Sequence, residues 1–252
     1  MDAAVTQALA AAEIGRAAGG ERVSLSVAEW AGHAPILEED IALANIALDE
    51  MGHAAIWYSL YAELTGDDPD RLVFFRKPGA YRNVQMVELP KGDWAFTLVR
   101  QYLFDAAESV MLPHLRAGTH QPLAEAAAKI ATEEVYHLRH SGLWLRRLGL
   151  GTEESHARTQ AALDTLWPYA VQLFALLPED ELLVAEAIIP DPSLVHREWD
   201  AIARSFLTAC GLHIPADTLP RRAIPRSEHT EHLMRLLAEM QSVARLDPAA
   251  EW

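Results

Sequence analysis

Two Glu-x-x-His motifs, Glu50–His53 and Glu134–His137, lie at matching positions of a repeat in this sequence. An acidic residue precedes each copy at the same separation: Glu21 stands as far before Glu50 as Asp105 stands before Glu134. Residues three apart on an α-helix share a face, so the Glu and His of each motif can reach the same point. The repeat therefore predicts two similar helical hairpins, each with an acidic side chain on one helix and a Glu-x-x-His pair on the other.

Two such hairpins build a four-helix bundle of the ferritin-like kind, in which these side chains hold a pair of metal ions. The expected fold class is all-α: a ferritin-like four-helix bundle with additional C-terminal helices. Carboxylate and imidazole ligands favour iron, manganese or zinc, and a di-iron pair is the candidate cofactor. The predicted metal ligands are Glu21, Glu50, His53, Asp105, Glu134 and His137.

Two alternatives remain open for this site. Glu21 directly follows Gly19-Gly20, which we expect to interrupt or kink the first helix, so Glu13, two turns earlier, is a rival ligand. The polar side chains could also satisfy one another by hydrogen bonds in a core that holds no metal. A third Glu-x-x-His, Glu153–His156, lacks the repeat offset and is interpreted as a coincidence.

Three further acidic residues lie beside the predicted ligands. Asp49 and Glu133 directly precede the two ligand glutamates, and Glu108 lies one turn after Asp105. Histidines that bind a metal usually donate their second ring N–H to a carboxylate or a carbonyl. These three residues are therefore candidates for orienting the ligands, or are acidic neighbours on another helix face.

The helical segments follow from apolar periodicity and from the placement of Gly and Pro. Helices are expected over about 3–18, 20–30, 36–65, 93–116 and 122–147, with an irregular crossing over 67–92. Further helices are expected over about 153–177, 179–188, 192–210 and 227–246. We therefore expect one domain, residues 1–252, with a bundle core over 20–147. The helices of 152–252 would pack around this core or form a subunit interface.

Composition excludes several classes of function. The net charge of −15 argues against nucleic acid or an anionic membrane as a partner. No apolar stretch approaches the about 20 residues that span a bilayer, and the N-terminus has no signal-peptide pattern, so we expect a cytoplasmic protein. The single cysteine excludes a cysteine-ligated iron–sulfur cluster, and no flavin-binding motif is visible. An oxygen-activating enzyme built on this chain would need a separate reductase.

Several strings in the sequence resemble the phenylacetate-degradation protein family. They are residues 29–35 (EWAGHAP), 37–49, 100–105, 229–233 and 237–241, so the resemblance runs over nearly the whole chain. It is strongest to the accessory, C-type subunits of ring-1,2-phenylacetyl-CoA epoxidases. In such systems two related ferritin-like subunits pair. The catalytic one holds a di-iron centre and epoxidises the aromatic ring with O₂, and an iron–sulfur flavoprotein reductase supplies electrons.

The resemblance thus implies an oligomeric complex in which this chain structurally supports a related catalytic subunit. One departure keeps an alternative open. Accessory subunits typically have altered residues at the ligand positions, whereas this chain keeps Glu50, His53, Asp105, Glu134 and His137. The alternative hypothesis is therefore a catalytically active di-iron monooxygenase in its own right.

Overall fold

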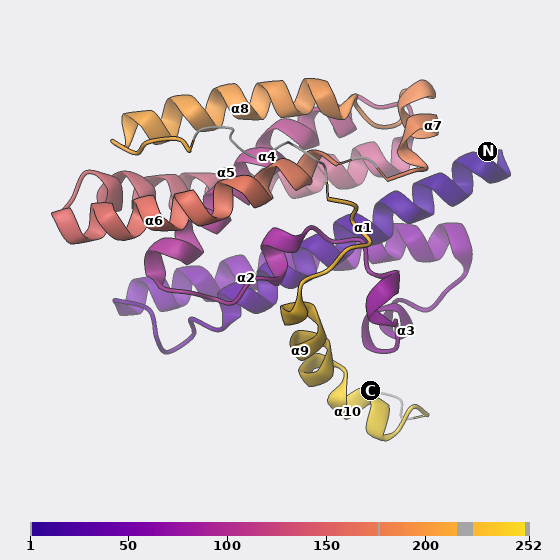
Figure 1. The fold of residues 1–252 in the computed structure, drawn as a ribbon. Helices are drawn as coiled ribbons and strands as arrows, with labels where there is room; N and C mark the ends of the chain where they lie inside the picture. The colour runs from indigo at the N-terminus through magenta and orange to yellow at the C-terminus, as the bar shows by residue number, and fades with distance from the viewer. Residues whose placement is uncertain (1, 176, 216–223, 250–252) are drawn as a thin grey trace.

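The structure is a computed structural model that describes residues 2–175, 177–215 and 224–249, and every regular element within these ranges is a helix (Figure 1). Four long helices form the bundle: α1 (Ala3–Ala28), α2 (Leu37–Thr65), α4 (Trp94–Arg116) and α5 (Gln121–Gly149). Helix α1 pairs along its length with α2, and α4 pairs with α5. The fold is a ferritin-like four-helix bundle, as the repeat predicted.

The ends of these helices are fixed by local side-chain chemistry. Asp2 caps α1 through the N–H of Ala4, and Asp93 caps α4 through the N–H of Phe96. Helix α2 ends at Gly66, whose φ of 78° is the left-handed conformation that glycine adopts at little cost. Both hairpins therefore begin at an aspartate cap, and the first one ends at a glycine in the left-handed conformation.

Helix α1 does not break at Gly19-Gly20, so the expected interruption there is wrong. Glycine is present because the two helices of the first hairpin approach closely. A Cβ atom on Gly20 would lie 3.2 Å from the backbone oxygen of Glu50 and 3.4 Å from Glu50 Oε2. Close contact with α2 accounts for the glycine at position 20, whereas a Cβ on Gly19 would meet only the Phe104 ring, at 3.9 Å.

The crossing between the hairpins is more ordered than the sequence suggested. It contains α3 (Pro69–Phe74) and two 3₁₀ turns, η1 (Pro78–Ala80) and η2 (Gln85–Glu88). Tyr81 of this connection is fully buried, and its hydroxyl donates to the carbonyl oxygen of Val73 at 3.0 Å. The connection therefore adds to the core beside α1 as well as joining the hairpins.

The C-terminal half packs mainly on the second hairpin. It comprises α6 (Glu153–Ala170), η3 (Val171–Phe174), α7 (Asp180–Ala185), α8 (Pro192–Ala209), α9 (Glu231–Met240) and α10 (Ser242–Leu246). Helices α6 and α8 cover α4, and the rings of Trp167 and Trp199 stack between them at 5.1 Å. The helices expected over 153–177 and 227–246 are each divided in two. Part of the proline-rich stretch before α9, residues 216–223, lies outside the described residues.

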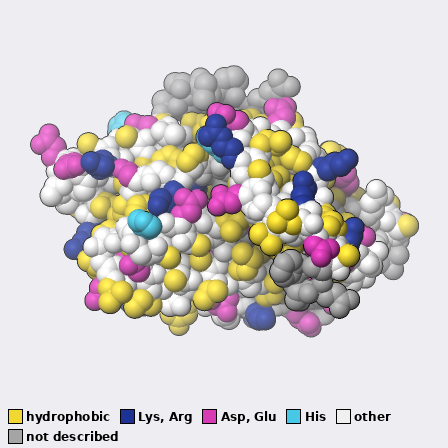
Figure 2. Space-filling model, turned by 90° about the horizontal axis from the view of Figure 1, so that it is seen from below, with side chains coloured by type: hydrophobic (Ala, Val, Ile, Leu, Met, Phe, Trp, Pro, Cys, Tyr) yellow, Lys and Arg dark blue, Asp and Glu magenta, His cyan; other side chains and the backbone are white. Residues whose placement is uncertain are grey.

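The surface seen from below in Figure 2 mixes hydrophobic, acidic and basic side chains. Among the described residues, no helix combines the length and the hydropathy needed to cross a bilayer.

Candidate metal centre

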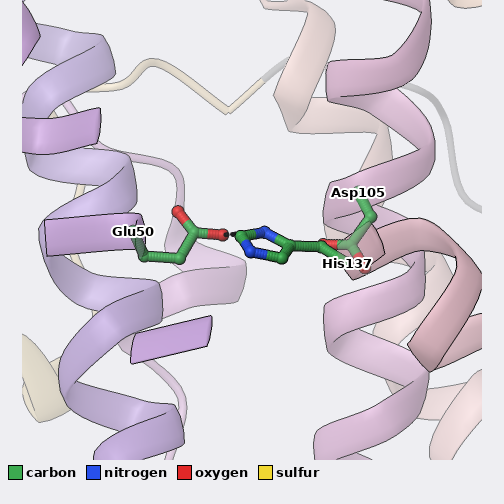
Figure 3. A group of neighbouring side chains, drawn as sticks. All are labelled: Glu50, Asp105 and His137. Atoms are coloured by element: carbon green, nitrogen blue, oxygen red, sulfur yellow. Dashed lines mark ion pairs between the residues drawn. The ribbon is translucent and has the colours of Figure 1, made fainter. Parts of the chain in front are cut away.

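Five of the six predicted ligands meet in the middle of the bundle. Glu50, His53, Asp105, Glu134 and His137 are all buried, and none is more than 4% exposed. Their donor atoms form two groups of three, in each of which every atom lies within 4.8 Å of the others. Glu50 belongs to both groups. It joins Asp105 and His137 in one, which Figure 3 shows with Glu50 reaching across from the opposite helix, and His53 and Glu134 in the other.

Both histidines turn the same ring nitrogen toward the carboxylates. His137 Nδ1 lies 3.1 Å from Glu134 Oε1 and 3.7 Å from Glu50 Oε1. His53 Nδ1 lies 3.4 Å from Glu134 Oε1 and 4.0 Å from Glu50 Oε2. The two Nδ1 atoms are thus the nitrogens that would face an ion.

The outer ring nitrogens of the histidines contact half-exposed carboxylates on the opposite hairpin. His53 Nε2 lies 2.7 Å from Glu133 Oε2, and His137 Nε2 lies 3.2 Å from Asp49 Oδ2. A carboxylate that accepts the second N–H fixes the tautomer and the orientation of a metal-binding imidazole. Asp49 and Glu133 are therefore placed to orient the histidines, although each contacts the histidine of the other hairpin.

Asp105 is held by two donors that the motif spacing did not reveal. Gln101 Nε2 donates to Asp105 Oδ1 at 2.6 Å, and Ser141 Oγ donates to Oδ2 at 2.7 Å. Gln101 precedes Asp105 by one helical turn, and Ser141 follows His137 by one turn. Sequence analysis could have found both residues from this separation of one helical turn from a predicted ligand. These bonds leave further lone pairs on the Asp105 carboxylate, directed by a fixed side chain.

The electrostatics of the cluster show crowding of negative charge. Burial, and then the neighbouring Glu134, raise the pKa values of Glu50 and Asp105 well above their usual range. Burial would also raise the pKa of Glu134, but hydrogen bonds with His137 and His53 outweigh it and lower that pKa. For His137, burial opposes the charged form, yet the hydrogen bond and charge of Glu134 raise its pKa to about 9. The cluster therefore favours positive charge in its centre.

Glu21, the sixth predicted ligand, lies outside the two groups of donor atoms. Its Oε2 accepts a hydrogen bond from Tyr58 Oη at 2.6 Å, and its Oε1 lies 3.4 Å from Arg22 Nη2. Arg76 Nη2 in turn donates to Tyr58 Oη at 3.1 Å. Glu21 thus belongs to a buried charge network between α1, α2 and the crossing connection.

Glu13, the alternative candidate for the first ligand, also lies outside the two groups of donor atoms. It is only 1% exposed, beside a cavity of about 150 Å³ that Leu60 and His120 also line. Neither of its carboxylate oxygens has a hydrogen-bond partner among the described residues, and burial raises its pKa to about 7 despite the opposing charge of Arg16. Helix α1, described from Ala3 to Ala28, therefore supplies no carboxylate to either group of donor atoms.

A cavity of about 90 Å³ lies between α1 and α4, and none of the five clustered ligand side chains lines it. Glu108 and Arg16 line it together with Phe104 and Gly19. Burial and the charge of Glu134 raise the pKa of Glu108 to about 7, which places this carboxyl within electrostatic reach of the cluster. Glu108 is thus a cavity-lining neighbour of the cluster.

Buried carboxylate oxygens without hydrogen-bond partners indicate that the residues present suit a metal ion. Glu50 Oε1 and Glu134 Oε2 are buried and have no hydrogen-bond partner within the described parts of the chain. Unpartnered buried carboxylate oxygens are costly, and a coordinated cation would satisfy them. Oxygen and imidazole donors with outer carboxylates behind the histidines are the chemistry of iron, manganese or zinc sites.

Fold and site together define a ferritin-like four-helix bundle protein with a buried carboxylate–histidine cluster at its centre. The chain belongs to the phenylacetic acid catabolic protein family, whose family model matches residues 10–252.

Two curated relatives from Escherichia coli (strain K12) are similar in sequence. The C subunit of 1,2-phenylacetyl-CoA epoxidase is 39% identical over 91% of this chain and 93% of its own length. The A subunit of that epoxidase is 29% identical over 67% of this chain and 54% of its own length. A solved structure, protein 19 with aldehyde deformylating oxidase activity from Synechococcus, superposes with a TM-score of 0.63 at 16% identity. It matches over 93% of this chain and 98% of that one, a likeness of fold.

Proposed function

We propose that this chain is the accessory, C-type subunit of a multicomponent phenylacetyl-CoA ring 1,2-epoxidase, which structurally supports a related ferritin-like catalytic subunit. One observation carries the proposal: the match to the C subunit of the Escherichia coli epoxidase covers almost the full length of both chains, whereas the match to the A subunit is weaker and covers only part of each. The proposal places the whole chain, 1–252, as one unit in a cytoplasmic oligomer.

The cluster in the bundle is the place where a di-iron pair would sit if this chain were loaded. Such a pair would supply oxygen activation, with electrons from a separate reductase. The chain's own residues would orient it: Glu133 and Asp49 would hold the histidines, while Gln101 and Ser141 would hold Asp105. In the accessory role, the contacts of His53 with Glu133 and of His137 with Asp49 join the two hairpins.

Exposed apolar side chains on α2 and α5 support a partner-binding role. Leu48 is 71% exposed next to Asp49, Tyr136 is 68% exposed near Glu133, and Leu143 on α5 is 61% exposed. A contiguous exposed apolar patch often marks a protein–protein interaction site, and we propose that these side chains form part of one. The C-terminal helices, which we also expected at an interface, carry Leu246 of α10 at 85% exposed.

The test is co-expression of this chain with an A-type catalytic subunit, followed by affinity capture and size-exclusion chromatography. The proposal predicts a stable stoichiometric complex. Leu48→Glu should weaken it at least about tenfold if α2 forms the contact, whereas Leu246→Glu should do so if the C-terminal helices do. Capture of no catalytic subunit by the folded wild-type chain would contradict the accessory role.

The second candidate is a catalytically active di-iron monooxygenase, and the five clustered ligand side chains with oriented histidines favour it. Glu50→Ala with Glu134→Ala, made in this chain only, separates the two candidates. Unchanged epoxidation by the assembled complex, with the complex intact, would assign catalysis to the partner alone. Loss of turnover without loss of assembly would assign a catalytic role to this chain.

A further inference from the structure

Glu13 is a buried carboxylate that the metal cluster does not use. It is 1% exposed, and neither of its carboxylate oxygens has a hydrogen-bond partner in the described parts of the chain. Burying a carboxylate without partners is unfavourable, which is why burial raises the pKa of Glu13 to about 7, while the charge of Arg16 acts in the opposite direction. A group perturbed in this way beside a cavity is a candidate binding residue.

The cavity beside Glu13 has a volume of about 150 Å³ and lies between α1, the last turns of α2 and the start of α5. Leu9 and Glu13 form its buried end, whereas Glu63 and Pro122 are exposed and lie at its mouth. The half-buried side chains between these ends are Leu60, Leu64 and His120. The cavity therefore leads from solvent, past a largely apolar wall, to the unpartnered carboxylate.

The lining of this cavity suits an organic cation. No Lys or Arg is among the described residues that line it, so an anion finds no counter-charge there. Burial lowers the pKa of His120, and its Nδ1 accepts a hydrogen bond from the N–H of Leu123, so this imidazole is neutral and does not repel a cation. A metal ion fits poorly, because the three-ligand groups found among the described residues are both in the cluster. Leucine and proline instead suit an alkyl chain, and cavities of about 150 Å³ hold molecules as large as benzene.

We propose that this cavity binds an alkylammonium group, either of a small primary amine or of a lysine side chain. The ammonium group enters first and donates to the unpartnered oxygens of Glu13, while the alkyl chain contacts Leu60 and Leu64. Charge-assisted hydrogen bonds from the ammonium group replace the partners that Glu13 lacks within the described residues. The site does not involve the metal cluster, so it is separate from any chemistry there.

The test is titration of the full-length chain with n-butylammonium chloride at pH 8, measured by saturation-transfer NMR and by isothermal calorimetry. Saturable binding is expected, and sodium butyrate, an anion of similar length, should not displace the butylammonium ion. Absence of saturable binding, or displacement by butyrate, would overturn the proposal. The readout needs neither a partner nor turnover, so its failure would leave the accessory role untouched.

The two carboxylates of the cavity provide a matched pair of variants. Glu13→Gln should weaken butylammonium binding at least about tenfold, while Glu63→Gln should weaken it less than about threefold, because solvent screens an exposed charge. Circular dichroism at the titration temperature checks that both variants are folded. Equal losses in the two variants would refute the site.

The affinity should also follow the ionisation of Glu13. With a pKa of about 7, roughly a tenth of Glu13 is ionised at pH 6 and roughly nine-tenths at pH 8, so binding should be about tenfold tighter at pH 8. The other titratable groups beside it are Arg16 on α1, Glu63 on α2 and His120 at the start of α5. Glu63→Gln should keep this pH dependence. An affinity of the wild type that does not change between pH 6 and pH 8 would contradict the role of Glu13.

Glu13→Gln also identifies the source of the ammonium group, a step that rests on the proposed function. If a lysine of the A-type subunit fills the cavity, the variant should weaken capture of that subunit about tenfold, and the assembled wild-type complex should not bind butylammonium. If the source is a free amine, capture should be unchanged and the complex should bind butylammonium as the lone chain does. Failure of the wild-type chain to capture any catalytic subunit would contradict the proposed function, whereas the titration of the lone chain decides the site.

Discussion

The buried network around Glu21 makes a quantitative prediction about stability. In Glu21→Gln the amide can still accept from Tyr58, but the negative charge opposite Arg22 is gone. Removing one partner of a buried ion pair costs about 3–5 kcal/mol, because the other charge stays buried and uncompensated. We expect about 3 kcal/mol, the lower end of this range, since the 3.4 Å ion pair is long and the Arg22 guanidinium also stacks on the Tyr81 ring at 4.9 Å.

The assay is urea unfolding of the metal-free protein, followed by circular dichroism, with thermal unfolding as a second measure. For a chain of this size, about 3 kcal/mol corresponds to a fall in Tm of roughly 6–12 °C. The double variant with Glu21→Gln and Arg22→Met is the control. Removing both charges should recover part of the loss, because no unpaired guanidinium remains at position 22.

Two results would refute this reasoning. If Glu21→Gln unfolds within about 1 kcal/mol of the wild type, Glu21 is not the counter-charge of Arg22. If the double variant is less stable than Glu21→Gln by as much as Arg22→Met alone destabilises the wild type, the two residues are not coupled.

The remaining predictions concern the neighbouring parts of the site. Glu13→Gln should stabilise the protein at pH 8 by up to about 3 kcal/mol and have little effect at pH 4. Burial raises the pKa of Glu13 from 4.5 to about 7, so the wild-type carboxyl lowers the free energy of unfolding increasingly as pH rises through that interval. An equal gain in stability at both pH values, measured by urea unfolding, would contradict this. Gly20→Ala should cost about 1–3 kcal/mol because its Cβ meets the α2 backbone, whereas Gly52→Ala, with open space around its Cβ, should gain up to about 1 kcal/mol. Glu133→Gln should weaken Mn²⁺ binding about 10–100-fold, because Glu133 is placed to hold the His53 imidazole, and an unchanged affinity in a Mn²⁺ titration would contradict this.

The pairing of the hairpins and most of the cluster were readable from the sequence. Helical geometry alone places the Glu and His of each motif on one face, and the constant offset between the two motifs and their preceding acidic residues requires the hairpins to repeat each other. Glu50, His53, Glu134 and His137 follow from this local regularity, and Asp105 follows from its fixed separation from the second motif. The fold class needed no tertiary information for the same reason.

Tertiary structure decided where the first predicted carboxylate ligand, Glu21, points. Glu21 has the predicted register, but its direction depends on Tyr58 of α2 and on Arg76 of the crossing connection, both of which lie far along the chain from it. The unbroken course of α1 through Gly19-Gly20 likewise coincides with a close approach of α2 at Gly20. The crossed contacts of the histidines with Asp49 and Glu133 also arise only when the hairpins pack. Local spacing fixes which residues share a helix face, whereas the rotation of that helix against its neighbours is set by buried charge and steric contact between segments distant in sequence.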